Sequence, residues 1–295
     1  MNVRRLTQAD YPEFERFLAG RAETSMFLRA NARSAGLDYE GEPLQARYYG
    51  AFGANGLEGV IALGWNGNLL VEAPDPLVLA EICRHVAESE ADHVALGVLG
   101  AGDQAARVLD WLRPPPECLR LSEREPLFRL DLDRLRTPAP LQEGALTWRP
   151  VGLQDLDLLI AWRSAYDVES LGGLRPEMAA DAPGMIRGWI ERDAPFLLEA
   201  DGTPVAMAAY NAALPDIVQI GGVYTPPELR GRGYGRAAVA AALVEARDQG
   251  VGSAILFTHA PAAERAYRAL GFEPIGDYHI ALFDPGVRMG GVRQG

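Results

Sequence analysis

Arginines and glycines are concentrated in one short segment, Arg230-Gly-Arg-Gly-Tyr-Gly-Arg236. Pro226 and Pro227 precede it; they lack N–H donors and turn the chain out of a strand that ends near Thr225. Glycine opens backbone conformations that are closed to other residues, and the first turn of a helix leaves N–H groups at its positive dipole end. With a helix beginning near Arg232 or Gly233, the segment predicts an anion site, most naturally for a phosphate or pyrophosphate.

Two common phosphate-binding motifs do not account for this segment. In a dinucleotide fingerprint, G-x-G-x-x-G, the last glycine counted from Gly231 would fall at Arg236, and counted from Gly233 it would fall at Ala238. The glycines also follow a late strand of their half of the chain, without the acidic residue expected after a second parallel strand. A P-loop requires a lysine, and all 28 basic residues of this chain are arginines.

The order of predicted elements is repeated in the two halves of the chain. "NVRRLTQADYPEFERFLAG" and "LTWRPVGLQDLDLLIAWRSAY" each indicate a strand, a turn and a helix. Each is followed by a hairpin, a strand, a helix, a strand, a second helix and a closing strand. Pro138 and Pro140 interrupt regular structure between the halves. We therefore predict one domain over residues 1–137, a joint near 137–144, a second domain over 145–284, and a flexible tail over 285–295.

Composition limits the classes of function. A net charge of −12 and a pI near 4.9 argue against a nucleic-acid partner, and they suit either solubility or attraction of a cationic amine. Two cysteines and four histidines form no metal-ligand pattern, so we expect no metal. A signal peptide and a run of eighteen apolar residues are both missing, so we expect a cytoplasmic protein that does not bind membranes. We expect the protein to be either a monomer or a homodimer.

The segment "RGRGYG" resembles the R/Q-x-x-G-x-G/A signature of the GCN5-related N-acetyltransferases (GNAT), with Arg230, Gly233 and Gly235 at its fixed positions. "QIGGVYTPPELRGRGYGRAAVAAAL" is similar to the central strand, pyrophosphate loop and following helix of that family, and "AERAYRALGF" to its later helix. The resemblance is specific over about residues 146–284. It implies an α/β (α+β) fold with two GNAT-like domains in tandem. Each would have a mixed, mostly antiparallel central sheet with a splayed strand pair, flanked by helices.

The resemblance also implies a co-substrate and its binding residues. Acetyl-CoA would lie between two splayed strands, and the acceptor would be an amine-bearing small molecule or peptide. The backbone around Val223 would pair with the pantetheine arm and polarise the thioester carbonyl, and Gly221 and Gly222 just before it suit a bulge. The implied cofactor-binding residues are Val223, Tyr224, Thr225, Arg230, Gly231, Arg232, Gly233, Tyr234, Gly235 and Arg236.

Tyr267 stands where the family commonly has the tyrosine that protonates the leaving thiolate, and it is the implied catalytic residue. The alternative is a core tyrosine on an apolar helix face. The chain departs from the family at Ala260, where an asparagine often contacts CoA, and Thr258 or His259 could replace that contact.

The general base is left open by the sequence. Gln219 occupies the central-strand position at which some family members carry a glutamate; it cannot accept a proton usefully, but it could position a water or the substrate amine. Other candidates are Glu199, Asp216, Glu169 and His259, with solvated carboxylates and a water chain as the alternative. Four aromatic residues could line the acceptor pocket or belong to the core: Trp162, Tyr166, Trp189 and Tyr210.

The first half of the chain lacks these features. Its counterpart of the phosphate loop reads "VEAPDPLVLAE", where Glu72 and Asp75 would repel a pyrophosphate, and Leu109 aligns with Tyr267. We therefore expect a degenerate first domain without CoA binding, and an acetyl-CoA-dependent N-acetyltransferase with one active site in the second domain. The alternative is a non-catalytic module that binds or senses acyl-CoA.

Overall fold

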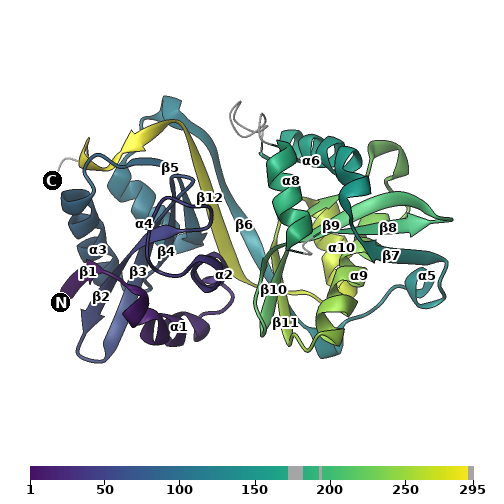
Figure 1. Cartoon of the computed structure of the whole chain (residues 1–295), viewed down its shortest axis with the longest axis horizontal. Helices are drawn as coiled ribbons and strands as arrows, with labels where there is room; N and C mark the ends of the chain where they lie inside the picture. The colour runs from purple at the N-terminus through teal and green to yellow at the C-terminus, as the bar shows by residue number, and fades with distance from the viewer. Residues whose placement is uncertain (172–181, 193–194, 292–295) are drawn as a thin grey trace. The chain divides into compact units, whose positions relative to one another are not determined.

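The computed structural model describes residues 1–171, 182–192 and 195–291, and the chain divides into two units (Figure 1). Unit 1 comprises residues 1–127 and 276–295, and unit 2 comprises residues 128–275. Two long strands, β6 (Leu119–Asp131) and β12 (Glu273–Arg288), each contain one of the divisions between the units.

Unit 1 is a mostly antiparallel sheet in the order β1-β2-β3-β4-β5-β12-β6, in which β4 and β5 are parallel. Helices α1 and α2 cover one face through Phe14, Leu18 and Leu28, and α3 and α4 cover the other through Ile82 and Val108. The other elements of unit 1 are β1 (Asn2–Arg5), α1 (Tyr11–Ala19), α2 (Met26–Ala35), β2 (Ala46–Gly53), β3 (Gly56–Gly64), β4 (Asn68–Glu72), α3 (Pro76–Ser89), β5 (Val94–Ala101) and α4 (Gly102–Leu112).

Unit 2 has the same architecture, with strand order β6-β11-β10-β9-β8-β7 and a parallel pair formed by β10 and β11. Helix α9 packs on one face through Ala238 and Leu243, together with Leu270 of α10, whereas Leu159 of α6 and Ile186 of α8 pack on the other face. Its elements are α5 (Ala139–Gln142), β7 (Leu146–Pro150), α6 (Leu156–Leu171), α8 (Ala182–Glu191), β8 (Pro195–Ala200), β9 (Thr203–Ala213), β10 (Ile217–Tyr224), α9 (Tyr234–Asp248), β11 (Ser253–Phe257) and α10 (Pro261–Leu270).

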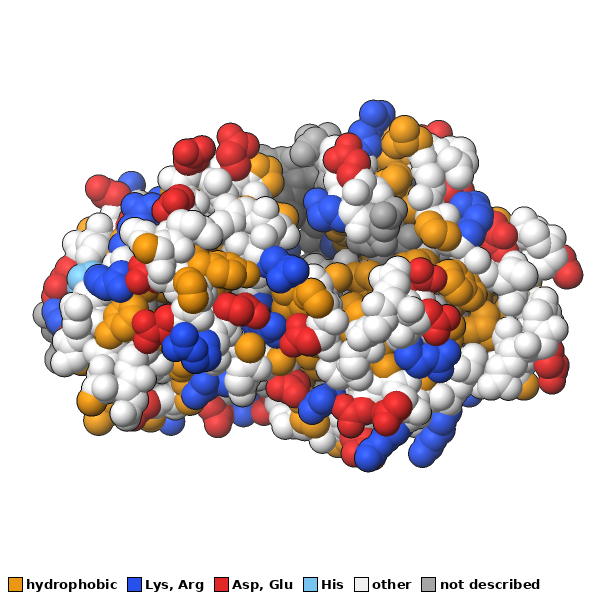
Figure 2. All heavy atoms as spheres, turned by 60° about the horizontal axis from the view of Figure 1, so that its bottom comes forward, with side chains coloured by type: hydrophobic (Ala, Val, Ile, Leu, Met, Phe, Trp, Pro, Cys, Tyr) orange, Lys and Arg blue, Asp and Glu red, His pale blue; other side chains and the backbone are white. Residues whose placement is uncertain are grey.

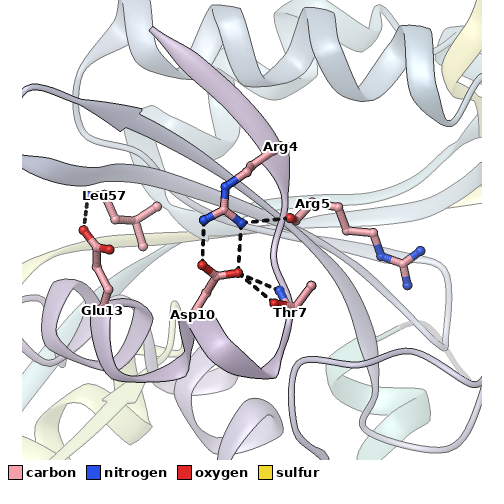
Figure 3. A network of polar contacts seen from close by, with 6 residues as sticks. All are labelled: Arg4, Arg5, Thr7, Asp10, Glu13 and Leu57. Carbon is pink, nitrogen blue, oxygen red and sulfur yellow. Dashed lines mark hydrogen bonds and ion pairs between the residues drawn. The ribbon is translucent and has the colours of Figure 1, made fainter.

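Each unit contains a matching ion pair between a strand and the helical turn that follows it. Arg4 forms hydrogen bonds of 2.9 and 2.6 Å to the Asp10 carboxylate, which also accepts the Thr7 N–H at 2.9 Å (Figure 3). Arg149 and Asp155 repeat this arrangement with bonds of 2.7 and 2.9 Å. In both pairs the arginine holds the pKa of the carboxyl below its ordinary value. In both units the pair thus holds the strand against the first helical turn that follows it.

The division of the chain differs from the boundaries expected from the sequence. The first division falls after Leu127 instead of near 137–144, because β6 continues without a break from one unit into the other. The expectation of a flexible tail over 285–295 is wrong for its described part. Val287 and Arg288 of β12 pair with Ala95 and Val94 of β5, and a short 3₁₀ helix follows. Residues 292–295 lie outside the described part of the chain.

The described residues contain no helix that is long and apolar enough to cross a membrane, and no group of His, Cys, Asp or Glu side chains that could hold a metal ion. On the face drawn in Figure 2, acidic side chains and arginines are interspersed, so this face presents no continuous basic stripe of the kind that binds nucleic acid.

Unit 1 contains a half-buried histidine, His93, whose tautomer is fixed by its neighbour. The Nη2 atom of Arg47 lies 2.9 Å from Nδ1 of His93, and Arg47 also pairs with Glu90 at 2.9 Å. A guanidinium can only donate, so Nδ1 must accept and the ring must carry its proton on Nε2. Burial, followed by the charge of Arg47, lowers the pKa of His93 below its ordinary value of 6.5.

This histidine should make the protein less stable in acid. Because the folded pKa of His93 is lowered, the unfolded chain binds more protons below pH 6.5, and the free energy of unfolding should fall as the pH drops from 6.5 towards the folded pKa. Substitution His93→Asn retains an acceptor near the Nδ1 position without the titration. It should reduce the pH slope of unfolding, measured by urea denaturation, by up to about one proton. A slope unchanged from that of the wild type would exclude His93 as a source of the acid sensitivity.

Candidate active site: a strand opening and a glycine loop in unit 2

The parallel strands β10 and β11 separate within unit 2. Within the described residues their pairing runs from Ile217 and Ser253 to Gln219 and Ile255, while β10 continues to Tyr224. Beyond Gln219 the edge of β10 that faces β11 is therefore available to an added strand-like ligand, since unpaired backbone groups in a sheet bind extended chains.

A bulge interrupts β10 inside this opening, as the paired glycines predicted. The register with β9 shifts between Gly221 and Tyr224, and Gly222 has a φ of +58°. A Cβ at Gly222 would lie 3.3 Å from the indole of Trp189, and a Cβ at Gly221 would clash with the side chain of Asn211. At Gly222 the left-handed backbone conformation favours glycine, and at Gly221 a side chain would displace that of Asn211.

The loop after β10 ends in a glycine that caps α9. Gly231 and Gly233 have φ values of +77° and +80°, in the left-handed region, and Gly233 is the N-cap of the helix. The first backbone bond of α9 runs from Ala237 N–H to Gly233 C=O at 3.0 Å, so the N–H groups of Tyr234, Gly235 and Arg236 precede the helical ladder. A Cβ at Gly231 would meet open space, so a ligand can reach the backbone there.

The three arginines of the loop are not equivalent. Arg230 donates to the Thr225 carbonyl at 2.9 Å and pairs with Glu169 of α6 at 2.8 Å, so it ties the end of β10 to α6. Arg232 and Arg236 are exposed and form no ion pair among the described residues, and a guanidinium nitrogen of Arg236 lies 3.6 Å from where a Gly233 Cβ would be. Two of the three predicted cations are therefore placed to meet an anion at the helix start.

The corresponding helix of unit 1 is capped by its own side chain. Asp75 is the N-cap of α3, and its carboxylate accepts the N–H groups of Leu77 at 2.7 Å and Val78 at 3.4 Å. The positive end of this helix is thus neutralised from within the chain. An anionic ligand would have to displace a carboxylate that is covalently tethered in place.

The strand pair of unit 1 also lacks the opening expected there. The pairing of β4 with β5 reaches Val71 and Gly100, one residue before β4 ends. Beyond it, Gln104 of α4 accepts the Ala73 N–H at 2.5 Å and donates to the buried Glu72 carboxylate at 3.0 Å. A side chain thus takes the backbone donor that an added ligand strand would need. The sequence predicted repulsion by Glu72, but it did not indicate this bond.

Tyr267 is located on α10, as predicted, but it is largely buried. Its side chain is 8% exposed and belongs to the core under α9, with its ring centroid 6.0 Å from that of Phe272 in an edge-on contact. Val223 packs against the same core.

Two of the base candidates are held in ion pairs. Glu199 of β8 accepts from Arg149 at 2.9 Å, and Glu169 pairs with Arg230. The backbone carbonyl of Asp216, in the turn before β10, accepts N–H groups from Gly252 and Ser253. Gln219, in contrast, is 1% exposed, and neither of its side-chain polar atoms has a partner among the described residues.

Three of the four predicted pocket aromatics share one face of the sheet. Trp162, Tyr166 and Trp189 pack in the cluster under α6 and α8, where the Trp162 ring lies 6.0 Å from that of Tyr224. Tyr210 takes the core alternative, because it packs on the opposite face and its hydroxyl donates to the Ala242 carbonyl of α9 at 2.6 Å. The sequence analysis also missed Arg163, which lies over the Trp189 ring and pairs with the buried Asp167; their i,i+4 spacing on a helix was the available signal.

Comparison with known proteins places this geometry in a class. Residues 160–272 match the model of the "Acetyltransferase (GNAT) family". The fold is similar to that of a GCN5-related N-acetyltransferase from Kribbella flavida, at 21% identity and a TM-score of 0.59 over 94% of this chain and 99% of that one. It is also similar to a GCN5-related N-acetyltransferase from Sphaerobacter thermophilus, at 17% identity and a TM-score of 0.56 over 95% and 94% of the two chains. No curated protein matches the chain.

The residues that match this acetyltransferase family model include β10, the glycine loop, α9, β11 and all of α10. The matched segment lies within unit 2, and the opened sheet and the glycine loop are both part of it.

A carboxylate introduced at the N-cap of α9 should reproduce the closed state of α3. Aspartate and asparagine tolerate left-handed backbone better than other non-glycine residues. In Gly233→Asp the new carboxylate would repel a pyrophosphate, and acetyl-CoA affinity measured by calorimetry should fall on the order of 10²-fold. Gly233→Asn is the matched neutral control, and its affinity for acetyl-CoA should fall much less. Unchanged affinity in a folded Gly233→Asp protein would mean that the anion site lies elsewhere.

Proposed function

We propose that the chain is an acetyl-CoA-dependent N-acetyltransferase with one active site, in unit 2, that acts on an amine of a small molecule or peptide. The observation that carries this proposal is the start of α9, where a left-handed glycine leaves the helix N-terminus without a side-chain cap beside two exposed arginines. The match of residues 160–272, within unit 2, to the model of an acetyltransferase family supports it.

The proposed roles follow from this geometry. Backbone N–H groups from Gly231 to Arg236 would hold the pyrophosphate, with Arg232 and Arg236 adding charge. The edge of β10 that is not paired with β11, at Val223 and Tyr224, would bind the pantetheine arm as an added strand, together with Thr225 just after the strand. When bound, acetyl-CoA supplies a thioester that an amine can attack.

The bulge gives Val223 a further role in this proposal. The shift of register after Gly221 turns a backbone donor of β10 away from the β9 ladder. An N–H at Val223 would then be aimed into the opening and stabilise negative charge on the carbonyl oxygen, which oxyanion donors do effectively in a site shielded from water. Tyr267 would give its proton to the leaving sulfur.

We further propose that unit 1 is a GNAT-like domain that has lost cofactor binding. Asp75 occupies the start of α3, and Gln104 occupies the backbone donor after β4. Both groups that a CoA molecule would bind in a GNAT-like unit are thus satisfied by the chain itself.

The direct test is an acceptor screen with the full chain, acetyl-CoA and a library of amines, in which released thiol is the readout. Thiol release that depends on an amine and is lost in Gly233→Asp would support an N-acetyltransferase. Binding of acetyl-CoA without thiol release from any amine would instead favour the acyl-CoA-binding or sensor alternative.

Tyr267→Phe separates a catalytic from a structural role. The substitution retains the ring and removes one proton and one hydrogen bond. We expect kcat to fall on the order of 10²-fold in steady-state assays, with acetyl-CoA affinity and Tm almost unchanged. A lowered Tm with normal turnover per folded molecule would identify Tyr267 as a core residue. Unchanged turnover in a stable protein would show that the thiolate does not take its proton from this side chain.

A further inference from the structure

The carboxamide of Gln219 is buried without a hydrogen-bond partner at the point where β10 and β11 separate. The residue is 1% exposed, and both Oε1 and Nε2 lack a partner among the described residues. Gln219 pairs with Ile255 in the last recorded step of the parallel ladder. Burying an amide without a partner destabilises the folded state, so a natural protein rarely retains such an amide without a ligand or a water to satisfy it.

The strand alternation shows which face this carboxamide is on. Val218 and Ile220 belong to the core under α9, so Gln219 between them is on the opposite face, with α6 and α8. Gly221 shares that face, and the side chain of Asn211 from β9 lies directly over it. The neutral side-chain amides of Gln219 and Asn211 therefore lie one after the other on the face of the sheet opposite α9.

The two carboxylates in the C-terminal half of α6 are both paired with arginines. Asp167 is 1% exposed and pairs with Arg163 at 2.8 Å, and Glu169 pairs with Arg230. An ammonium group brought to Gln219 would find amide dipoles but no uncommitted carboxylate from this half of α6, and an uncompensated buried charge is costly. An uncharged amine has a lone pair and N–H groups, which match the Nε2–H donors and the Oε1 acceptor of Gln219.

We propose, on the basis of the proposed function, that Gln219 positions the acceptor nitrogen in its uncharged form, either directly or through one water. The enzyme would therefore select weakly basic amines. The aromatic side chains on the same face, Trp189 over Gly222 and Trp162 beside Tyr224, suit an acceptor with a planar ring. The nitrogen–carbon bond forms as the carbon–sulfur bond breaks. The nitrogen transfers a proton to water, and the leaving sulfur gains a proton.

The pH profile of wild-type turnover tests the charge state of the acceptor. The two probes are aniline, a weak base, and benzylamine, a strong one of similar shape. The rate constant kcat/KM for benzylamine should rise about tenfold per pH unit between about pH 6 and about pH 8, because the neutral fraction rises in that way. The profile for aniline should be flat. A flat benzylamine profile would overturn the proposal, since it would mean that the ammonium form is accepted.

Gln219→Met tests the residue itself, because methionine has a similar volume and no amide. Removing an unpartnered buried amide should raise the Tm, while the lost contact to the acceptor should lower kcat/KM about tenfold for both amines with acetyl-CoA affinity unchanged. Gln249→Met, at the exposed C-cap of α9, is the matched control. It should change neither the Tm, nor kcat/KM, nor the affinity for acetyl-CoA. Unchanged kcat/KM in Gln219→Met would refute the role.

Gln219→Glu provides the opposite change. A carboxylate at this position can neutralise an ammonium, so benzylamine should gain relative to aniline near about pH 6. No such gain in a folded variant would count against the proposal. If no amine supports thiol release by the wild type, the proposed function itself fails. If turnover occurs but is indifferent to Gln219, the assignment of this residue alone fails.

Discussion

The start of a helix provides an anion site only while its N–H groups are left for a ligand, and this constraint separates the two units of the chain. At α9 the N-cap is Gly233, which has no side chain with which to cap the helix and adopts a φ of +80°. At α3 the N-cap is Asp75, whose carboxylate accepts two of these N–H groups. The same place in the same order of elements is therefore open in one unit and occupied in the other. Backbone conformation and one carboxylate account for the difference.

The sheet shows a corresponding contrast. In unit 2 the parallel pair separates after Gln219 and β10 bulges at its glycines, which leaves backbone donors for an extended ligand. In unit 1 the pair remains joined almost to the end of β4, and Gln104 takes the next donor. A cofactor that needs both a strand edge and a helix start can therefore be held where both are left unoccupied. The strand edge and the helix start lie within one β-strand–loop–helix segment, so a few residues decide whether a unit of this architecture can bind the cofactor.

The predictions from sequence were best where the residue type dictates the backbone. Gly231, Gly233 and the Gly221–Gly222 pair predicted left-handed turns and a bulge, and these are present, because other residues avoid those conformations. Asp75 was treated as a repelling charge, although an aspartate directly before a proline is a common start of a helix. The sequence did not indicate that Tyr210 and Trp189 lie on opposite faces of the sheet, because the face of a residue depends on strand register and helix packing. The unit boundary was missed because β6 and β12 pair through segments that are far apart in the sequence.

The number of acetyl-CoA molecules bound by one chain tests this account most directly. The whole protein carries two helix starts in equivalent places of two units, one left open by glycine and one closed by aspartate. Isothermal titration calorimetry of the full chain with acetyl-CoA should therefore show one site per chain. Two equivalents bound per chain, or one that persists when the α9 loop is disrupted, would contradict the claim that capping decides where the cofactor binds.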